Sequence, residues 1–417
     1  MRNIFDQYSQ PENRVTHALM TALNEDRNLL GRFLRDLVKH RPKTALSRLH
    51  VLEQRMPDSE ELEERDLESP GIPDGWIYDD DGWCVVIESK VIAKLTSGQI
   101  RRHLSTARDR EFPQPIVVAI TPIVESGLPE GTVHLKWSDV YAWLRRDDTE
   151  WAKRAAEYLE IAEGRLIEAE QLKEGALTKF AGIPFDSDHP YNYFEGKRIL
   201  GLALGELKAN SKLVRGLGVN PEAPGRGAIT GRRADAVWDF LTLAEADWEE
   251  SFTAHPHLTL GIRAQETEAT VTVPNAVNGA MRQRLVQLGE KGFLEVTAAI
   301  LTNMQPLLVR CKGATPLFRG IQRRYPSMRS TPIIDAKIEF DLRTAIPGSG
   351  LPKAQPRWLS AAYGSFVKKG GANYQIQFGV QFRYDRCSEL KRSDATELFA
   401  EAWLGCKPLV KLGHKVR

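Results

Sequence analysis

The 417-residue sequence is poor in cysteine and contains no long apolar run. Its four cysteines, Cys84, Cys311, Cys387 and Cys406, form no CxxC pair, so we expect buried reduced thiols and neither structural zinc nor a disulfide framework. No segment approaches the roughly 18 apolar residues of a membrane span, and residues 1–14 lack the apolar core of a signal peptide. We therefore expect a cytoplasmic protein that does not contact a membrane.

The sequence also lacks internal repeats and low-complexity segments. Its 42% hydrophobic and 27% charged residues are typical of a soluble globular protein. A chain of this length exceeds one core of usual size, so we expect two domains. Residues 1–175 are predicted to form the first domain, residues 176–192 a linker rich in Gly, Pro and Asp, and residues 193–417 a basic α+β domain for nucleic-acid binding or assembly.

Acidic residues are scarce in the second half of the chain. Residues 1–200 contain 27 basic and 35 acidic side chains, whereas residues 201–417 contain 30 and 20. The second half is therefore the better candidate for contact with phosphate groups, and a solvated basic face is the alternative. The candidate residues are Arg226, Arg232 and Arg233 in a glycine-rich loop, and Arg319, Arg323 and Arg324 in a stretch without acidic residues.

Hydrophobic periodicity predicts an α/β first domain with a mixed central sheet flanked by helices. A helix at residues 12–23 precedes a hairpin whose strands are residues 76–78 and 84–87. Further along the chain the pattern predicts a helix at 97–108, strands at 115–121 and 133–137, and a long helix at about 149–174. In the second domain, alternation predicts half-exposed antiparallel strands at 334–342 and 374–384, together with helices at 193–212, 280–290, 293–308, 357–367 and 393–412.

Three charged residues of the hairpin form a candidate site. Glu88 and Lys90 are two positions apart on a strand, so their side chains project from the same face. Asp74 precedes the first strand, and pairing of the hairpin would bring it within reach of Glu88. Two close carboxylates repel each other, and Mg²⁺ or Mn²⁺, which prefer hard oxygen ligands, would relieve that repulsion. Such a site suits hydrolysis of a nucleic-acid backbone.

The [DE]xK spacing by itself is weak evidence. Five such tripeptides occur in the chain, and three of them lie in predicted helices, where residues two apart face different directions. Asp335-Ala336-Lys337 lies on a predicted strand but has no acidic residue upstream for almost forty positions. Only Glu88-Ser89-Lys90 follows an apolar strand and has Pro73-Asp74 one hairpin upstream.

This pattern resembles the signature of the PD-(D/E)xK phosphodiesterase superfamily, whose fold is restriction endonuclease-like. The resemblance covers about the first 150 residues, and the α-β-β-β-α-β core of the superfamily matches the predicted order of elements. It implies a restriction endonuclease-like core followed by the α+β domain, and Mg²⁺-dependent cleavage of DNA. Many members also carry an acid on the first core helix and a Gln on the helix after the ExK strand, and Glu12 and Gln99 occupy the matching places.

The resemblance therefore implies a catalytic set of Asp74, Glu88, Lys90, Gln99 and Glu12, with Asp74, Glu88 and Glu12 as ligands of Mg²⁺ or Mn²⁺. A capping box with Ser9 is the alternative for Glu12, and His103, one turn after Gln99, is a further candidate for the cleft. We expect a DNA-cleaving enzyme of restriction or phage defence that acts as a homo-oligomer or as a subunit of a defence complex. An RNase with the same site and a non-catalytic nucleic-acid-binding or scaffold subunit are the alternatives.

Overall fold

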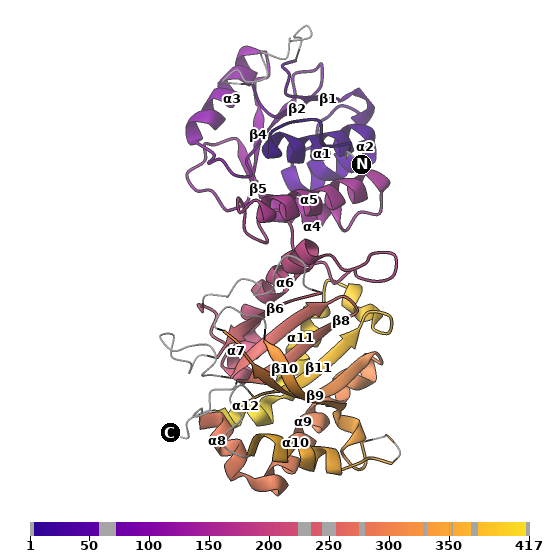
Figure 1. The fold of residues 1–417 in the computed structure, drawn as a ribbon. Coiled ribbons are helices and arrows are strands. Elements are labelled where there is room, and N and C mark those ends of the chain that lie inside the picture. Colours follow the sequence, from indigo (N-terminus) through magenta and orange to yellow (C-terminus); the bar gives the residue numbers. More distant parts are fainter. Residues whose placement is uncertain are drawn as a thin grey trace. The chain divides into compact units, whose positions relative to one another are not determined.

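The chain forms two compact units, Met1–Lys179 and Phe180–Arg417 (Figure 1). The computed structural model describes residues 4–57, 72–223, 235–243, 256–274, 280–327, 332–349, 351, 353–367 and 374–413. A mixed five-stranded sheet lies at the centre of the first unit, and an antiparallel six-stranded sheet at the centre of the second. Both units are mixed α/β structures, as the periodicity predicts.

The sheet of the first unit has the strand order β1-β2-β3-β4-β5. Its strands are β1 (His50–Glu53), β2 (Gly75–Tyr78), β3 (Cys84–Ser89), β4 (Ile116–Thr121) and β5 (Thr132–Lys136). The first three strands are antiparallel, whereas β3, β4 and β5 run parallel. In the β2–β3 hairpin Gly75 lies opposite Ile87, so Asp74, one residue earlier, lies at the edge of the sheet where β3 and β4 end.

Helices cover both faces of this sheet (Figure 1). They are α1 (Pro11–Glu25), α2 (Arg27–Phe33), α3 (Ser97–Asp109), α4 (Trp137–Leu144) and α5 (Glu150–Glu168). Helix α3 buries Ile100 and Leu104 in one cluster with Trp76 and Val86 of the hairpin. On the opposite face, the hydroxyls of Thr16 in α1 and Ser89 in β3 share a hydrogen bond. Because side chains alternate along a strand, Glu88 projects toward α3 and Ser89 toward α1.

The sheet of the second unit has the strand order β10-β9-β11-β8-β7-β6. Its strands are β6 (Ala236–Thr242), β7 (His257–Arg263), β8 (Glu266–Val273), β9 (Ala314–Arg324), β10 (Ile333–Asp341) and β11 (Tyr374–Arg383). Its helices are α6 (Tyr193–Lys208), α7 (Ser211–Leu217), α8 (Ala280–Gln287), α9 (Gly289–Arg310), α10 (Arg357–Val367), α11 (Ala395–Gly405) and α12 (Lys407–Gly413). The sequence predicted β10 and β11, together with most of these helices.

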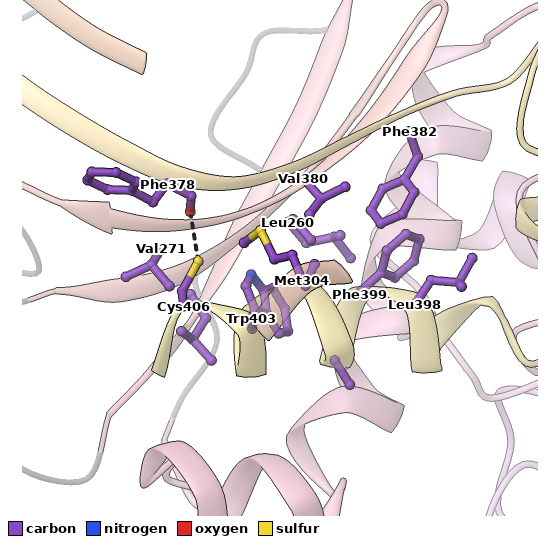
Figure 2. Close-up of a cluster of buried hydrophobic side chains, with 14 of the residues drawn as sticks. Leu260, Val271, Met304, Phe378, Val380, Phe382, Leu398, Phe399, Trp403 and Cys406 are labelled. Atoms are coloured by element: carbon purple, nitrogen blue, oxygen red, sulfur yellow. Dashed lines mark hydrogen bonds between the residues drawn. The ribbon is translucent and has the colours of Figure 1, made fainter. Parts of the chain in front are cut away.

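Aromatic and aliphatic side chains of α9 and α11 pack against the sheet of the second unit (Figure 2). Phe399 of α11 contacts Phe382 of β11, with 5.7 Å between the ring centroids. Trp403 is buried and donates its indole N–H to the backbone oxygen of Thr270 at 3.2 Å. Fully burying a large apolar side chain contributes roughly 1.5–3 kcal/mol, so this layer is a main source of stability for the second unit.

Helix α9 is long and apolar enough to cross a membrane, by length and composition alone. In the structure one side of this helix, which includes Phe293, Ile300 and Met304, is buried in the core of the second unit. Its other side bears exposed residues such as Glu295 and Val309. The helix therefore has the amphipathic pattern of a core helix that packs on a sheet.

The predicted linker at residues 176–192 is not a separate segment. The backbone N–H groups of Leu177 and Thr178 donate to the Glu163 carboxylate in the first unit, at 2.9 and 3.3 Å. Phe180 and Phe185 are buried in the core of the second unit. Along the chain the first unit therefore ends at Lys179 and the second begins at Phe180. Apolar side chains of this segment pack even though its composition is rich in Gly, Pro and Asp.

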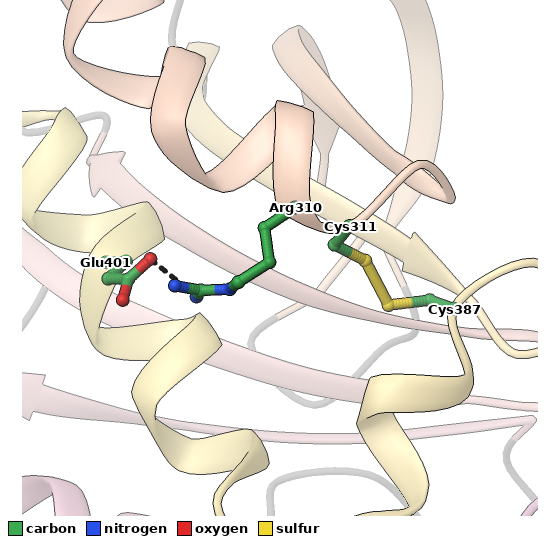
Figure 3. Close-up of a disulfide and its surroundings, with 4 residues drawn as sticks. All are labelled: Arg310, Cys311, Cys387 and Glu401. Atoms are coloured by element: carbon green, nitrogen blue, oxygen red, sulfur yellow. Dashed lines mark hydrogen bonds and ion pairs between the residues drawn. A yellow bond between two sulfur atoms is a disulfide. The ribbon is translucent and has the colours of Figure 1, made fainter.

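The expectation of four reduced cysteines is wrong for Cys311 and Cys387, which form a disulfide with 6.1 Å between their Cα atoms (Figure 3). Cys311 directly follows α9, where Arg310 also pairs with Glu401 of α11 at 2.7 Å. The two cysteines are 76 positions apart, and only the fold brings them together. Cys84 and Cys406 are buried free thiols, as predicted.

Replacement of both bonded cysteines, Cys311→Ser and Cys387→Ser, should destabilise the second unit. A cross-link over 76 residues restricts the unfolded chain, which corresponds to about 4 kcal/mol in the chain-entropy description. Thermal unfolding should therefore show a lower Tm for the double variant. Dithiothreitol should lower the Tm of the wild type and leave the double variant unchanged. A wild-type Tm that does not respond to dithiothreitol would contradict the cross-link.

Candidate active site

The carboxylate of Glu88 is the centre of a buried polar cluster at the end of β3. Its side chain projects toward α3 and the residue is only 3% exposed. The ammonium of Lys90 lies 2.7 Å from Oε1, and Nε2 of His103 lies 2.9 Å from Oε2. Both carboxylate oxygens are therefore bound, one by the residue that directly follows β3 and one by a residue of α3. This is the juxtaposition of acid and amine that the two-residue spacing predicts.

Neighbouring groups keep both Glu88 and Lys90 in their charged forms. Burial acts to raise the pKa of Glu88, but the hydrogen bond from His103 and the charge of Lys90 outweigh it and hold that pKa below its usual value. Burial likewise acts to lower the pKa of Lys90, and the carboxylates of Glu88 and Asp74 raise it above its usual value. Lys90 is therefore an ammonium at neutral pH, held beside an ionised carboxylate.

Asp74 is the second carboxylate of the cluster. It lies between Pro73 and the first residue of β2, and its Oδ2 accepts the backbone N–H of Ser89 at 2.7 Å. Burial and the negative charge of Glu88 raise the pKa of Asp74 to about 7, although Lys90 and the Ser89 hydrogen bond oppose the rise. The hairpin thus brings together the two acids that the sequence predicted, and one of them carries unrelieved repulsion.

Asp74 and Glu88 fit a divalent metal ion in donor chemistry. Carboxylate oxygens are the ligands that Mg²⁺ and Mn²⁺ prefer, and a cation between them would relieve the repulsion that raises the pKa of Asp74. Oε1 of Glu88 already binds Lys90, so a cation at this oxygen would share it with the ammonium. Two side-chain ligands do not complete the coordination shell of such a metal ion, so backbone oxygen atoms and water would supply the remaining ligands.

A second group of potential metal ligands lies in the other unit. Among the described residues, Cys311, Cys387 and Glu389 are the one set of three His, Cys, Asp or Glu side chains whose ligand atoms all lie within 4.8 Å of one another. Cys311 and Cys387 are joined in the disulfide and thus are not thiolate ligands. This set therefore offers one carboxylate and no thiolate to a metal ion.

His103 contributes a contact that the ExK pattern does not contain. It is 3% exposed, and its Nδ1 has no hydrogen-bond partner within the described part of the chain. A buried polar atom without a partner is rare, and such atoms are found at functional sites. The sequence signal for His103 was its position one turn after Gln99, which made it a candidate for the cleft. That position could not identify Glu88 as its partner.

Gln99 forms the capping box of α3 and has no contact with the carboxylate cluster. The side-chain Oε1 of Gln99 accepts hydrogen bonds from both the backbone N–H and the hydroxyl of Thr96, at 3.1 Å each. The backbone N–H of Gln99 donates to the Thr96 hydroxyl. The catalytic role implied for Gln99 therefore lacks a geometric basis. Capping fixes the start of the helix that carries His103, and this is how Gln99 acts on the site.

Glu12 holds the loop that follows Lys90. Its Oε1 accepts the backbone N–H groups of Val91, Ile92 and Ala93 at 3.1, 2.9 and 2.8 Å. The alternative capping box with Ser9 does not form, because Gln10 is the N-cap of α1 and makes no side-chain cap. Three N–H donors on one oxygen explain why Glu12 lies at the strand end, and they make it an anchor of the loop in this structure.

Backbone contacts also fix the position of Lys90. Its N–H donates to the oxygen of Ile120 in β4 at 2.8 Å, and its own oxygen accepts the indole N–H of Trp137 at 3.1 Å. Trp137 is fully buried at the start of α4. Four elements, α1, α3, α4 and β4, therefore support the end of β3, which is a rigid setting for a reactive group.

Of the six arginines predicted to bind phosphate in the second unit, the structure describes three, and they differ in burial and in partners. Arg226, Arg232 and Arg233 lie outside the described residues. The prediction is wrong for Arg319, which is 4% exposed and pairs with Glu268, 2.7 Å from Nη1 to Oε2, and with Glu339. Burial acts to lower the pKa of Arg319, and these two carboxylates raise it further than burial lowers it.

Arg323 and Arg324 differ in exposure. Arg323 is half-buried and donates to the side-chain oxygen of Gln375 at 2.7 Å, and burial lowers its pKa. Arg324 is exposed and pairs with Asp335 at 3.2 Å. Its acidic partner lies on the neighbouring strand β10. The stretch of sequence around Arg324 lacks acidic residues, but the adjacent strand of the sheet supplies one.

The Asp74→Asn variant should be more stable than the wild type at high pH. The folded-state pKa of about 7 exceeds the ordinary carboxyl value of about 4. The stabilisation from this bound proton is complete below pH 4 and is lost as the pH rises through 7. In the presence of a chelator, Asp74→Asn should therefore have a higher Tm than the wild type at pH 8 and nearly the same Tm at pH 4. Asp80→Asn, at an exposed position in the hairpin turn, is the control. An equal Tm difference at both pH values would refute the assignment.

Comparison with known proteins assigns the chain to no family. No protein-family model matches it. Neither the curated proteins nor the solved structures contain a match.

Proposed function

We propose that the chain is a metal-dependent phosphodiesterase that cleaves DNA. The observation that supports this most strongly is the buried Glu88 carboxylate, with Lys90 beside it and Asp74 at the same strand end. A cation held by the two carboxylates would polarise a phosphodiester and lower the pKa of an attacking water. In the first unit α1 and α2 precede three antiparallel strands, then a helix and two strands parallel to β3, and this order agrees with a restriction endonuclease-like core.

Each residue of the cluster has its own role in the proposed reaction. Asp74 and Glu88 would hold the cation. Lys90, whose raised pKa keeps it protonated, would stabilise the negative charge that develops on the phosphate. His103 donates to Oε2 of Glu88 and thereby fixes the orientation of that carboxylate. Glu12 would keep the loop after Lys90 in place through three backbone N–H groups.

The proposal extends to the setting in which such an enzyme acts. PD-(D/E)xK domains joined to a further domain are common in restriction and phage defence, so we place the chain there, in the cytoplasm. The second unit would bind nucleic acid or mediate assembly, either as a homo-oligomer or within a defence complex. RNA is the alternative substrate, because the same residues would act on either backbone.

One observation favours a non-catalytic alternative. Both oxygens of Glu88 are already bound, by Lys90 at 2.7 Å and by His103 at 2.9 Å. A cluster closed on itself in this way could serve as a structural ion pair in a nucleic-acid-binding or scaffold subunit. The two alternatives differ in the response to a divalent cation, because only the enzyme requires Asp74 and Glu88 to bind one.

Glu88→Gln and Lys90→Ala should each abolish Mg²⁺-dependent cleavage. Loss of the carboxylate removes a metal ligand, and loss of the ammonium removes charge stabilisation, so a drop of at least about 100-fold is expected for each. Cleavage is measured on linear DNA, plasmid DNA and RNA, each with Mg²⁺ and with EDTA. Asp335→Asn with Lys337→Ala is the matched control, because it removes an exposed tripeptide of the same pattern on β10.

A thermal shift on the same proteins separates the enzyme from the scaffold. Mg²⁺ binding to the folded state should raise the Tm of the wild type and of the control, but not that of Glu88→Gln. Equal cleavage by the wild type and Lys90→Ala would refute the proposal. A wild type that neither cuts nor responds to Mg²⁺ would favour the scaffold.

A further inference from the structure

Two loops beside the candidate active site carry exposed apolar side chains. The loop after β3 contains Ile92, and the loop after β4 contains Ile123 and Val124, which are 47%, 66% and 71% exposed. Strands β3 and β4 are parallel neighbours, with Ser89 opposite Ile120, so both loops leave the sheet at the same edge. We call residues 91–96 and 122–131 the site rim.

Hydrogen bonds hold both loops of the site rim in place. The backbone of Lys90 donates to Ile120, which ties the ends of the two strands together. The hydroxyl of Ser97, in the first turn of α3, donates to the backbone oxygen of Gly127 at 3.1 Å. Glu12 holds the loop around Ile92 through consecutive N–H groups. The apolar side chains are thus exposed on a surface whose backbone is anchored from three sides.

Positive charge without a partner lies next to the rim. Lys94, Arg101 and Arg102 are exposed, and none of the three takes part in an ion pair or hydrogen bond with the described residues. Both arginines lie on the solvent side of α3, whose buried side carries His103. In the second unit, by contrast, Arg319 and Arg324 have carboxylate partners. These three exposed cations are therefore available to an anionic ligand.

We infer that the site rim is the surface that holds a nucleic-acid duplex, with Ile92, Ile123 and Val124 inserted at a base step. This inference rests on the proposed function. Exposed aliphatic side chains serve other proteins as wedges that unstack neighbouring bases, and the unstacking of a step requires a few kcal/mol from other contacts. Pairing of Lys94, Arg101 and Arg102 with phosphates supplies such contacts. The opened step then lies beside Lys90, where the phosphodiester must reach the carboxylates.

The role of the positive charges beside the rim is tested by measuring how tightly the full chain binds a labelled DNA duplex in the presence of EDTA. Binding is monitored by fluorescence anisotropy over a range of salt concentrations. Arg101→Gln with Arg102→Gln should weaken binding and reduce the slope of log K against log salt by about 0.9 for each lost phosphate contact. Arg108→Gln, an exposed arginine in the last turn of the same helix, is the control and should bind as the wild type does. Equal binding by the double variant and the control would overturn the inference.

Base unstacking is tested with 2-aminopurine placed within the duplex. The wild type should increase its fluorescence, and Ile92→Ser or Ile123→Ser with Val124→Ser should lose most of that increase. Ile161→Ser, at an exposed apolar position on α5, is the matched control. An unchanged signal in the rim variants would refute the wedge. An RNA duplex of the same sequence identifies which backbone the rim prefers.

These readouts are independent of cleavage. A wild type that binds and unstacks the duplex through the rim but does not cut it with Mg²⁺ would support the rim and refute the nuclease. A wild type that cuts while the rim variants bind and cut equally well would support the nuclease and refute the rim.

Discussion

The burial of the Glu88 carboxylate is the constraint on which the first unit depends. An ionised carboxylate in a protein interior is unfavourable unless it is paired and hydrogen-bonded, and Lys90 and His103 provide both kinds of contact. Lys90 reaches it because alternate residues of a strand share a face, and His103 reaches it because Ile100 and Leu104 seat α3 on the sheet. Packing and polar contacts therefore fix one arrangement together.

Local periodicity predicted much of the fold and failed where polar residues are buried. Strands β2 to β5 of the first unit and most helices follow directly from apolar spacing, whereas β1 was missed. Strands β6 to β9 were missed, in part because one face of this sheet buries Thr259, Thr270 and Thr272, polar residues that weaken the apolar periodicity of the sequence. Arg319 was misread for a related reason, since Glu268 neutralises it from 51 positions away. Charge along the chain does not reveal pairing across a sheet.

The geometry of Asp74, Glu88 and Lys90 followed from strand alternation and hairpin pairing, both of which are local rules. Gln99 and Glu12 occupy positions that the sequence resemblance selects, yet Gln99 caps α3 and Glu12 binds a loop. Which partner a polar side chain takes depends on loop backbone that spacing does not describe. The disulfide between Cys311 and Cys387 was missed for the same reason, because its closure depends on how the second unit folds.

The contacts around Lys90 have a consequence for biosynthesis. Its loop depends on Glu12, near the beginning of the chain, and its backbone oxygen depends on Trp137, which is translated 47 positions later. Contacts this distant in sequence form late, after their loops have closed. A nascent chain that ends before α4 would thus present an unfinished strand end. The chemistry of the cluster becomes available only once the first unit has been synthesised almost completely.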